Sequence, residues 1–113
     1  MSERTKVLFV CSRNKWRSPT AERIFARDPD LAVRSAGTSR NAQRSISERD
    51  IRWADVIFVM ERKHKDRLAA SFPRAMQFKI VHVLEILDDY QLMDPELIDL
   101  LEQAVTPLLK NRN

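Results

Sequence analysis

The amino-acid sequence predicts an α/β fold in three layers, with a central four-stranded parallel sheet and helices on both faces. Three observations support this prediction. Short apolar segments alternate with longer segments of helical character along the chain. The apolar segments that carry the clearest signal are hydrophobic almost throughout, which is typical of parallel strands buried on both faces. The length of 113 residues suits one domain, which we assign to residues 1–113.

The four strands are predicted at residues 6–10, 31–35, 55–60 and 77–84. The first and third are continuous apolar runs, and the second and fourth alternate in polarity. We expect the strand order 2-1-3-4, as in flavodoxin-like sheets, with ligands bound at the carboxyl ends of the strands where the order reverses. The only glycine, Gly37, follows the second strand, and we expect it to adopt a backbone conformation closed to other residues.

Helices are predicted between the strands and after the last one. Pro19 suits the first turn of a helix that ends near residue 28. Residues 38–47 form a polar and basic loop, and Ser47 is a candidate cap for a short helix. Residues 61–72 form a highly charged helix, whose charges, His64 included, we assign to a solvated face. The final helix begins at residue 95, and Pro107 should kink or end it.

Composition narrows the class of protein. The chain is 43% hydrophobic and 32% charged, as expected of a soluble globular protein, and no segment approaches the ~20 apolar residues that span a bilayer. The N-terminus does not resemble a signal peptide. One cysteine excludes an internal disulfide framework and suits a reducing compartment, so we expect a cytoplasmic protein. The net charge of +4 favours anionic substrates, whereas no nucleic-acid motif or membrane segment stands out.

The first strand runs into a short polar loop with the pattern Cys-x5-Arg-Ser. Thiols are mostly protonated at neutral pH and are then poor nucleophiles. Cys11 would lie beside a loop whose backbone N–H groups turn inward, just before a helix N-terminus, and such a nest favours a thiolate or a phosphate. Arg17 could grip two phosphoryl oxygens, and Ser18 could hydrogen-bond the thiolate. Asn14 tolerates the left-handed backbone that a tight anion loop requires.

The loop therefore predicts a nucleophile, Cys11, and an anion-binding site for phosphate. The residues predicted to bind the phosphate are Ser12, Arg13, Asn14, Lys15, Trp16 and Ser18, together with Arg17. The alternative is that a lone cysteine after valines is a small buried apolar residue, and Cys-x5-Arg also recurs by chance. The preceding strand, the following helix and the basic loop favour the catalytic interpretation.

Four sequence blocks together resemble the low molecular weight phosphotyrosine phosphatases. They are Val7 to Glu22, Ser35-Ala36-Gly37-Thr38, Ala54 to Met60 and Asp94-Pro95, in the order of that family. The resemblance implies a phosphomonoester hydrolase that forms a cysteinyl-phosphate, with no cofactor and no metal. It also implies that Ser35 braces the phosphate loop through Asn14. The implied substrate is phosphotyrosine in proteins, with small phosphomonoesters left open.

The resemblance assigns the general acid to Asp94, with Asp89 and Asp88 as further candidates. An aspartate before proline at a helix start is also an ordinary helix cap, so this assignment has a structural alternative. The acid would protonate the leaving oxygen and later activate water. Because Glu96 and Leu97 replace the family's usual aromatic pair after this aspartate, specificity for tyrosine stays open.

Other departures from the family pattern bear on function. Arg13 stands where the family commonly has glycine, and Trp16 stands where many members have a second cysteine, so their protective disulfide cannot form here. Residues 38–47 look contracted. Two alternative functions follow from the same loop: a non-catalytic phosphate-binding or phosphopeptide-binding module, and an arsenate reductase, which needs further cysteines that this chain lacks. The sequence predicts no oligomeric state.

Overall fold

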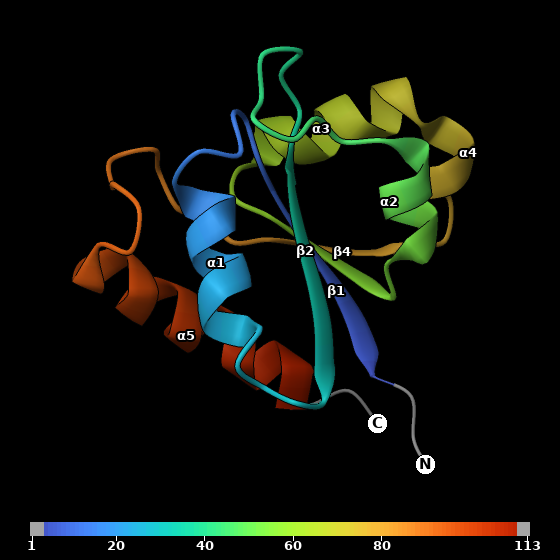
Figure 1. Cartoon of the computed structure of the whole chain (residues 1–113). Helices are drawn as coiled ribbons and strands as arrows, with labels where there is room; N and C mark the ends of the chain where they lie inside the picture. Colours follow the sequence, from blue (N-terminus) through green and yellow to red (C-terminus); the bar gives the residue numbers. More distant parts are fainter. Residues whose placement is uncertain (1–3, 111–113) are drawn as a thin grey trace.

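Four parallel strands form the central sheet in the order β2-β1-β3-β4, as predicted. The structure is a computed structural model that describes residues 4–110 (Figure 1). The strands are β1 (Thr5–Cys11), β2 (Leu31–Gly37), β3 (Val56–Val59) and β4 (Ile80–Val83). The helices are α1 (Arg17–Phe25), α2 (Glu48–Trp53), α3 (Arg62–Ser71), α4 (Pro73–Met76) and α5 (Pro95–Lys110). No helix within residues 4–110 is long and apolar enough to cross a membrane.

The helices cover both faces of the sheet, which gives the predicted three layers (Figure 1). Successive residues of β1 point to opposite faces, so Phe9 and Cys11 lie in the core under α1 and α5, and Leu8 and Val10 lie in the core under α2, α3 and α4. All four side chains are buried because the central strand has helices on both sides.

Two predicted elements differ from the structure. The last strand is shorter than the predicted 77–84, because Pro73 begins an additional helix, α4, and Phe78 adopts a positive φ of 69° just before β4. Helix α5 does not end at Pro107 but continues to Lys110. The proline lies in the last turn, where few hydrogen bonds remain to be lost.

The reason predicted for a glycine at position 37 is wrong. Gly37 does not have a positive φ. Instead, a Cβ atom at Gly37 would lie 2.5 Å from the carbonyl oxygen of Ser12, 2.6 Å from Cβ of Ala42 and 2.9 Å from the amide nitrogen of Asn14. Glycine is needed at this position because the loop after β1 approaches the backbone of β2 too closely for any side chain.

The carboxyl ends of β1 and β2 lie side by side at the end of the sheet that is at the top of Figure 1, where Cys11 pairs with Gly37. The segment 38–46 leaves β2 at this end and is hydrogen-bonded to the loop that follows β1. The chain leaves β1 through α1, which covers one face of the sheet, and reaches β3 through α2, which covers the other face. The strand order therefore reverses at this end of the sheet. Ligands bind at such a point in open α/β sheets.

Candidate active site

Cys11 is the last residue of β1 and is 3% exposed. Its Sγ atom lies 3.0 Å from the hydroxyl oxygen of Ser18, in the first turn of α1. The Nδ2 group of Asn14 donates to the same hydroxyl oxygen at 2.9 Å, so the Ser18 proton can point at the sulfur, which lies nearer than the other acceptor, the carbonyl oxygen of Ala36 at 3.5 Å. A hydroxyl that donates to sulfur stabilises the thiolate form of Cys11.

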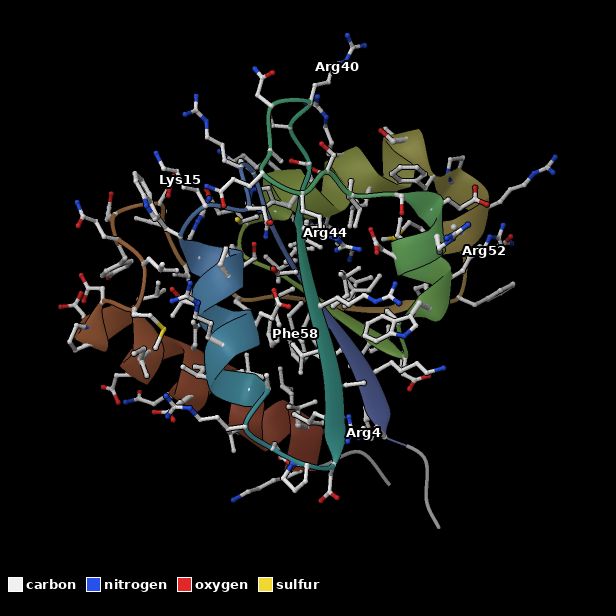
Figure 2. The ribbon with its side chains drawn as sticks, in the orientation of Figure 1. Arg4, Lys15, Arg40, Arg44, Arg52 and Phe58 are labelled. Atoms are coloured by element: carbon white, nitrogen blue, oxygen red, sulfur yellow. The ribbon has the colours of Figure 1, made fainter. Side chains whose placement is uncertain are left out.

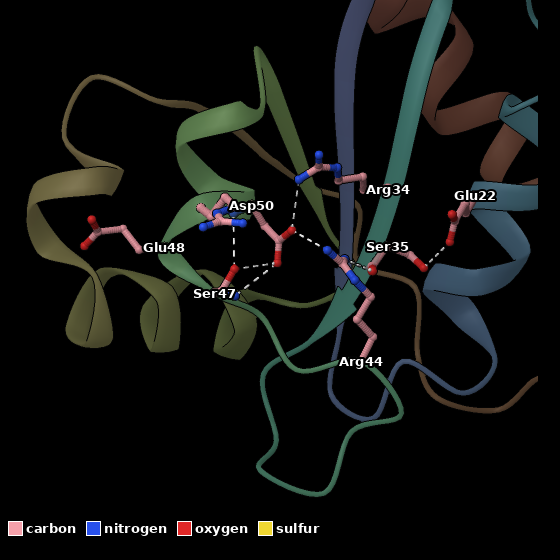
Figure 3. A pocket seen from close by; sticks show the side chains of 8 residues that line it. Glu22, Arg34, Ser35, Arg44, Ser47, Glu48 and Asp50 are labelled. Atoms are coloured by element: carbon pink, nitrogen blue, oxygen red, sulfur yellow. Dashed lines mark hydrogen bonds and ion pairs between the residues drawn. The ribbon is translucent and has the colours of Figure 1, made fainter.

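Asn14 has a φ of 54°, which confirms the left-handed conformation expected from the sequence. The side chain holds this conformation through a second hydrogen bond, because Nδ2 also donates to the hydroxyl of Ser35 at 2.9 Å. Ser35 in turn donates to the carboxylate of Glu22 on α1 (Figure 3). The loop is therefore tied to both β2 and α1 by a chain of hydrogen bonds through the buried Asn14 and Ser35 to the half-buried Glu22.

Arg17 is the first residue of α1 and is only 2% exposed. Its Nη1 atom donates to Oε2 of Glu61 at 2.5 Å and to the carbonyl oxygen of Ile86 at 2.8 Å, and its Nε atom lies 3.6 Å from the carboxylate of Asp88. Burial raises the pKa of Glu61, but the hydrogen bond and charge of Arg17 outweigh burial and lower that pKa below its ordinary value. Ionised Glu61 thus holds the guanidinium at the end of the loop.

His64 is buried, at 1% exposure, so its assignment to a solvated face is wrong. The backbone N–H of Glu61 donates to Nδ1 at 3.0 Å, which leaves the imidazole proton on Nε2. Nε2 lies 2.8 Å from the hydroxyl of Ser12, so the imidazole donates to that oxygen. Burial, reinforced by the nearby charge of Arg17, lowers the pKa of His64 to about 4 and keeps the ring neutral.

A cavity of about 250 Å³ opens over the sulfur. Its lining residues are Cys11, Arg13, Lys15, Trp16, Arg17 and Asp88. The Nζ atom of Lys15 lies 4.8 Å from the centroid of the Trp16 ring, so these two side chains form one part of the wall. The cavity is cationic, with one carboxylate beside the buried guanidinium, and it has the size of a site for a small phosphoryl group.

The three candidate acids occupy different places. Asp88 lines the cavity and its side chain is 55% exposed, within reach of both solvent and Arg17. Asp94 precedes α5, where its Oδ1 atom accepts the backbone N–H of Glu96 at 2.9 Å, as a helix cap does. Asp89 lies between Asp88 and Tyr90, whose hydroxyl donates to Glu96 at 2.7 Å. Neither Asp89 nor Asp94 is among the residues that line this cavity.

A larger hollow of about 860 Å³ lies behind the loop, between β2 and α2. Figure 3 shows Arg34 and Arg44 directed at the buried carboxylate of Asp50, at 3.3 and 2.5 Å. Burial raises the pKa of Asp50, but hydrogen bonds from Arg44 and Ser47 lower it below its ordinary value overall. The charges in this hollow are thus largely compensated. These residues support β2, because Nη1 of Arg44 also donates to the carbonyl oxygen of Ser35 at 2.7 Å.

The structure brings most of the predicted site residues together around the loop. Arg13, Lys15, Trp16 and Arg17 line the cavity with Cys11, while Asn14, Ser18 and Ser35 support it from within. Ser12 points to the other side, toward α3. Glu61 and His64 were not predicted from the sequence. Within residues 4–110 no group of three or more histidine, cysteine or carboxylate side chains is placed to hold a metal ion.

Residues 6–51 match the family model of the low molecular weight phosphotyrosine protein phosphatases. The low molecular weight protein-tyrosine-phosphatase Wzb of Escherichia coli K12 is 34% identical over 91 residues, a match that covers 59% of this chain and 62% of Wzb. The Wzb of Escherichia coli O157:H7 gives the same values. The chain thus spans less than two thirds of the length of these curated relatives.

Solved structures extend the similarity to nearly the whole chain. The tyrosine phosphatase Wzb from Escherichia coli K30, in complex with phosphate, superposes with a TM-score of 0.77 at 23% identity, covering 96% of this chain and 98% of that one. Wzb of Vibrio vulnificus with benzylphosphonate gives 0.75 at 22% identity, covering 94% and 97%. A mutant of YwlE from Bacillus subtilis gives 0.67 at 25% identity, covering 95% and 99%. These structures confirm the predicted fold.

Proposed function

We propose that the chain is a low molecular weight phosphotyrosine protein phosphatase that hydrolyses phosphomonoesters through a cysteinyl-phosphate, a proposal supported by the family-model match over residues 6–51 and the 34% identity to Wzb. The observation that supports this best is the position of Cys11. Its sulfur lies 3.0 Å from the hydroxyl oxygen of Ser18, in a cavity that the buried Arg17 also lines. A stabilised thiolate and a fixed guanidinium at one cavity are what phosphoryl transfer to sulfur requires.

In the first step the Cys11 thiolate attacks phosphorus, so that an S–P bond forms and the P–O bond to the leaving group breaks. Arg17 and the backbone N–H groups of the loop hold the phosphoryl oxygens as their charge redistributes. The leaving oxygen takes a proton from an acid in the cavity. We assign this acid to Asp88, because Asp88 lines the cavity with Cys11 whereas Asp94 caps α5.

In the second step water attacks the phosphorus of the cysteinyl-phosphate and releases inorganic phosphate. Asp88, now a carboxylate, takes the proton from the water. The hydroxyl of Ser18 stabilises the departing thiolate, since it lies 3.0 Å from Sγ. The cycle restores both groups without a cofactor.

The proposed substrate is a phosphorylated protein, with phosphotyrosine as the phosphorylated residue and small phosphomonoesters as alternatives. The ring of Trp16 lines the cavity and offers a flat surface for an aromatic leaving group. The mechanism needs a reduced Cys11, so we place the protein in a reducing compartment, the cytoplasm.

The test is hydrolysis of p-nitrophenyl phosphate in the presence of EDTA. We expect turnover by the wild type, none above background by Cys11→Ser, and a kcat at least about 100-fold lower for Asp88→Asn. Asp94→Asn is the matched control and should keep a kcat within a few-fold of the wild type. A slow Asp94→Asn with a normal Asp88→Asn would reassign the acid. A folded wild type that binds phosphate without turnover would instead be a phosphate-binding module.

A further inference from the structure

A second polar hollow lies on the other side of the phosphate loop, against α3. It has a volume of about 240 Å³ and is lined by Ser12, Thr38, Ser39, Lys63, His64 and Arg67. A neighbouring hollow of about 420 Å³ shares Thr38, Ser39 and Arg67 with it and extends to Arg40 and Phe72. We call the two together the α3 groove.

The α3 groove begins one residue from the nucleophile. Ser12 lines the groove, whereas Cys11 and Arg13 on either side of it line the catalytic cavity. The other wall is held in place by backbone hydrogen bonds, because the N–H groups of Thr38, Ser39 and Gln43 donate to the carbonyl oxygens of residues 11, 12 and 13, each at 2.9 Å. Consecutive residues of one loop, Cys11 and Ser12, thus line the catalytic cavity and the groove respectively.

The groove is cationic, and two of its three cations, Arg40 and Arg67, form no ion pair within residues 4–110. Arg40, Lys63 and Arg67 line it, and no carboxylate is among its lining residues. Within residues 4–110, Lys63 lies 3.8 Å from Glu61, and neither Arg40 nor Arg67 lies within 4 Å of a carboxylate. Figure 2 shows Arg40 projecting from the top of the segment 38–46, on the same edge of the molecule as Lys15.

We propose that the α3 groove binds acidic side chains next to the phosphorylated residue of a protein substrate. This inference rests on the proposed phosphatase function and specifies its substrate class. Carboxylates would pair with Arg40, Lys63 and Arg67, and the serine and threonine hydroxyls of the lining offer hydrogen bonds to a peptide. Proteins that bind single-stranded nucleic acid stack the bases on exposed aromatic rings, and among the described residues that line the groove Phe72 is the only Phe, Tyr or Trp, while the ring of His64 is buried.

The test compares two phosphotyrosine peptides that differ only in the residues flanking the phosphotyrosine, glutamate in one and glutamine in the other. The quantity measured is the ratio of their kcat/KM values. We expect the wild type to prefer the acidic peptide by about three- to tenfold at low salt, and the preference to shrink at 0.5 M salt. Arg40→Gln/Arg67→Gln should bring the ratio close to one.

The matched control is Arg23→Gln/Arg27→Gln, which removes the same charge from two exposed positions, one in α1 and one in the turn after it, that do not line the groove. It should keep the wild-type ratio. Because each variant is compared with itself on two peptides, a loss of folded protein does not change the ratio.

Each other outcome overturns this inference. A wild-type ratio of one, with normal hydrolysis of p-nitrophenyl phosphate, rejects the groove and leaves the proposed function intact. A ratio that survives in Arg40→Gln/Arg67→Gln places the discrimination elsewhere. A ratio of one together with competitive inhibition by a single-stranded RNA oligonucleotide assigns the groove to nucleic acid. No turnover on p-nitrophenyl phosphate or either peptide rejects the proposed function itself.

Discussion

The Nε2 atom of His64 lies 2.8 Å from the hydroxyl of Ser12, the residue that follows the nucleophile. Three residues earlier, Glu61 binds the guanidinium of Arg17 at the far end of the same loop. The start of α3 therefore contacts both ends of the phosphate loop. Since the backbone N–H of Glu61 also donates to His64, the two contacts form one rigid unit.

We expect His64→Ala to lower kcat on p-nitrophenyl phosphate by about tenfold, because the loss of one buried hydrogen bond leaves Ser12 free to shift. The cavity that the alanine leaves should also lower the free energy of unfolding by about 2 kcal/mol. The measurements are steady-state kinetics and urea denaturation. Lys65→Ala, on the next residue of α3, is the control. A folded His64→Ala enzyme with wild-type kcat would show that Ser12 needs no such support.

Acidification should destabilise the protein through His64. Its pKa is about 4 in the folded protein, against an ordinary value of 6.5, so the unfolded chain binds more protons between these pH values. The unfolding free energy should therefore fall as pH drops from 6.5 to 4, by up to about 1.4 kcal/mol per pH unit.

His64→Gln should remove this part of the slope, as measured by urea denaturation at half-unit intervals of pH. The lowered pKa values of Asp50 and Glu61 place the titration of these carboxylates at lower pH, where they too become destabilising as they gain protons. Equal slopes for wild type and His64→Gln between pH 6.5 and 5 would contradict the assignment of a buried neutral imidazole.

Ser35→Ala should weaken both the fold and the catalytic loop. The substitution removes the acceptor for Asn14 and the donor to Glu22, and it leaves the strained backbone of Asn14 with the bond to Ser18 alone. We expect a loss of about 1–2 kcal/mol in unfolding free energy and a lower kcat. Ser45→Ala, which deletes an exposed hydroxyl 3.2 Å from the carbonyl of Ser39, should change neither quantity measurably.

Gly37→Ala should be more damaging than its size suggests. The added methyl group would meet the carbonyl oxygen of Ser12 at 2.5 Å, and a backbone atom cannot move aside as a flexible side chain can. We expect a loss of about 2–3 kcal/mol in unfolding free energy together with impaired phosphate binding. The double variant Gly37→Ala/Ala42→Gly relieves only the side-chain contact, so it should recover little. Full recovery in calorimetry would show that Ala42, rather than the loop, sets the limit.

The sheet could be predicted from the sequence because its two inner strands, β1 and β3, are continuous apolar runs and its outer strands alternate in polarity, and the Cys11 loop directly follows β1. The conformation of Asn14 was also predictable, since few residues accept a positive φ. His64 was not, because it stands among Arg62, Lys63 and Lys65 and only tertiary contacts bury it. The one local signal was its position three residues after Glu61, where a side chain can reach back to the helix start.

The resemblance assigns the acid to Asp94, whereas our proposal of Asp88 rests on the lining of the cavity, and the residues alone do not distinguish the candidates. Asp88, Asp89 and Asp94 lie in one irregular segment between β4 and α5, and no periodicity indicates which carboxylate faces the sulfur. The proline after Asp94 draws attention to it, although that pattern equally marks the start of a helix. Which aspartate lines the cavity depends on how Ile86 and Arg17 anchor the segment, and they are 69 residues apart in the chain.

The supports of the phosphate loop also bear on how the protein folds. Asn14 is held from 21 residues away, Ser12 from 52 and Arg17 from 44 and 69. Local helix formation in α1 can begin early, but contacts of such high sequence separation form only after long loops have closed. During refolding, recovery of the phosphate-binding geometry should therefore lag behind the appearance of helix, and chains cut before Glu61 would contain the nucleophile and its loop but lack the side chains that hold Ser12 and Arg17 in place.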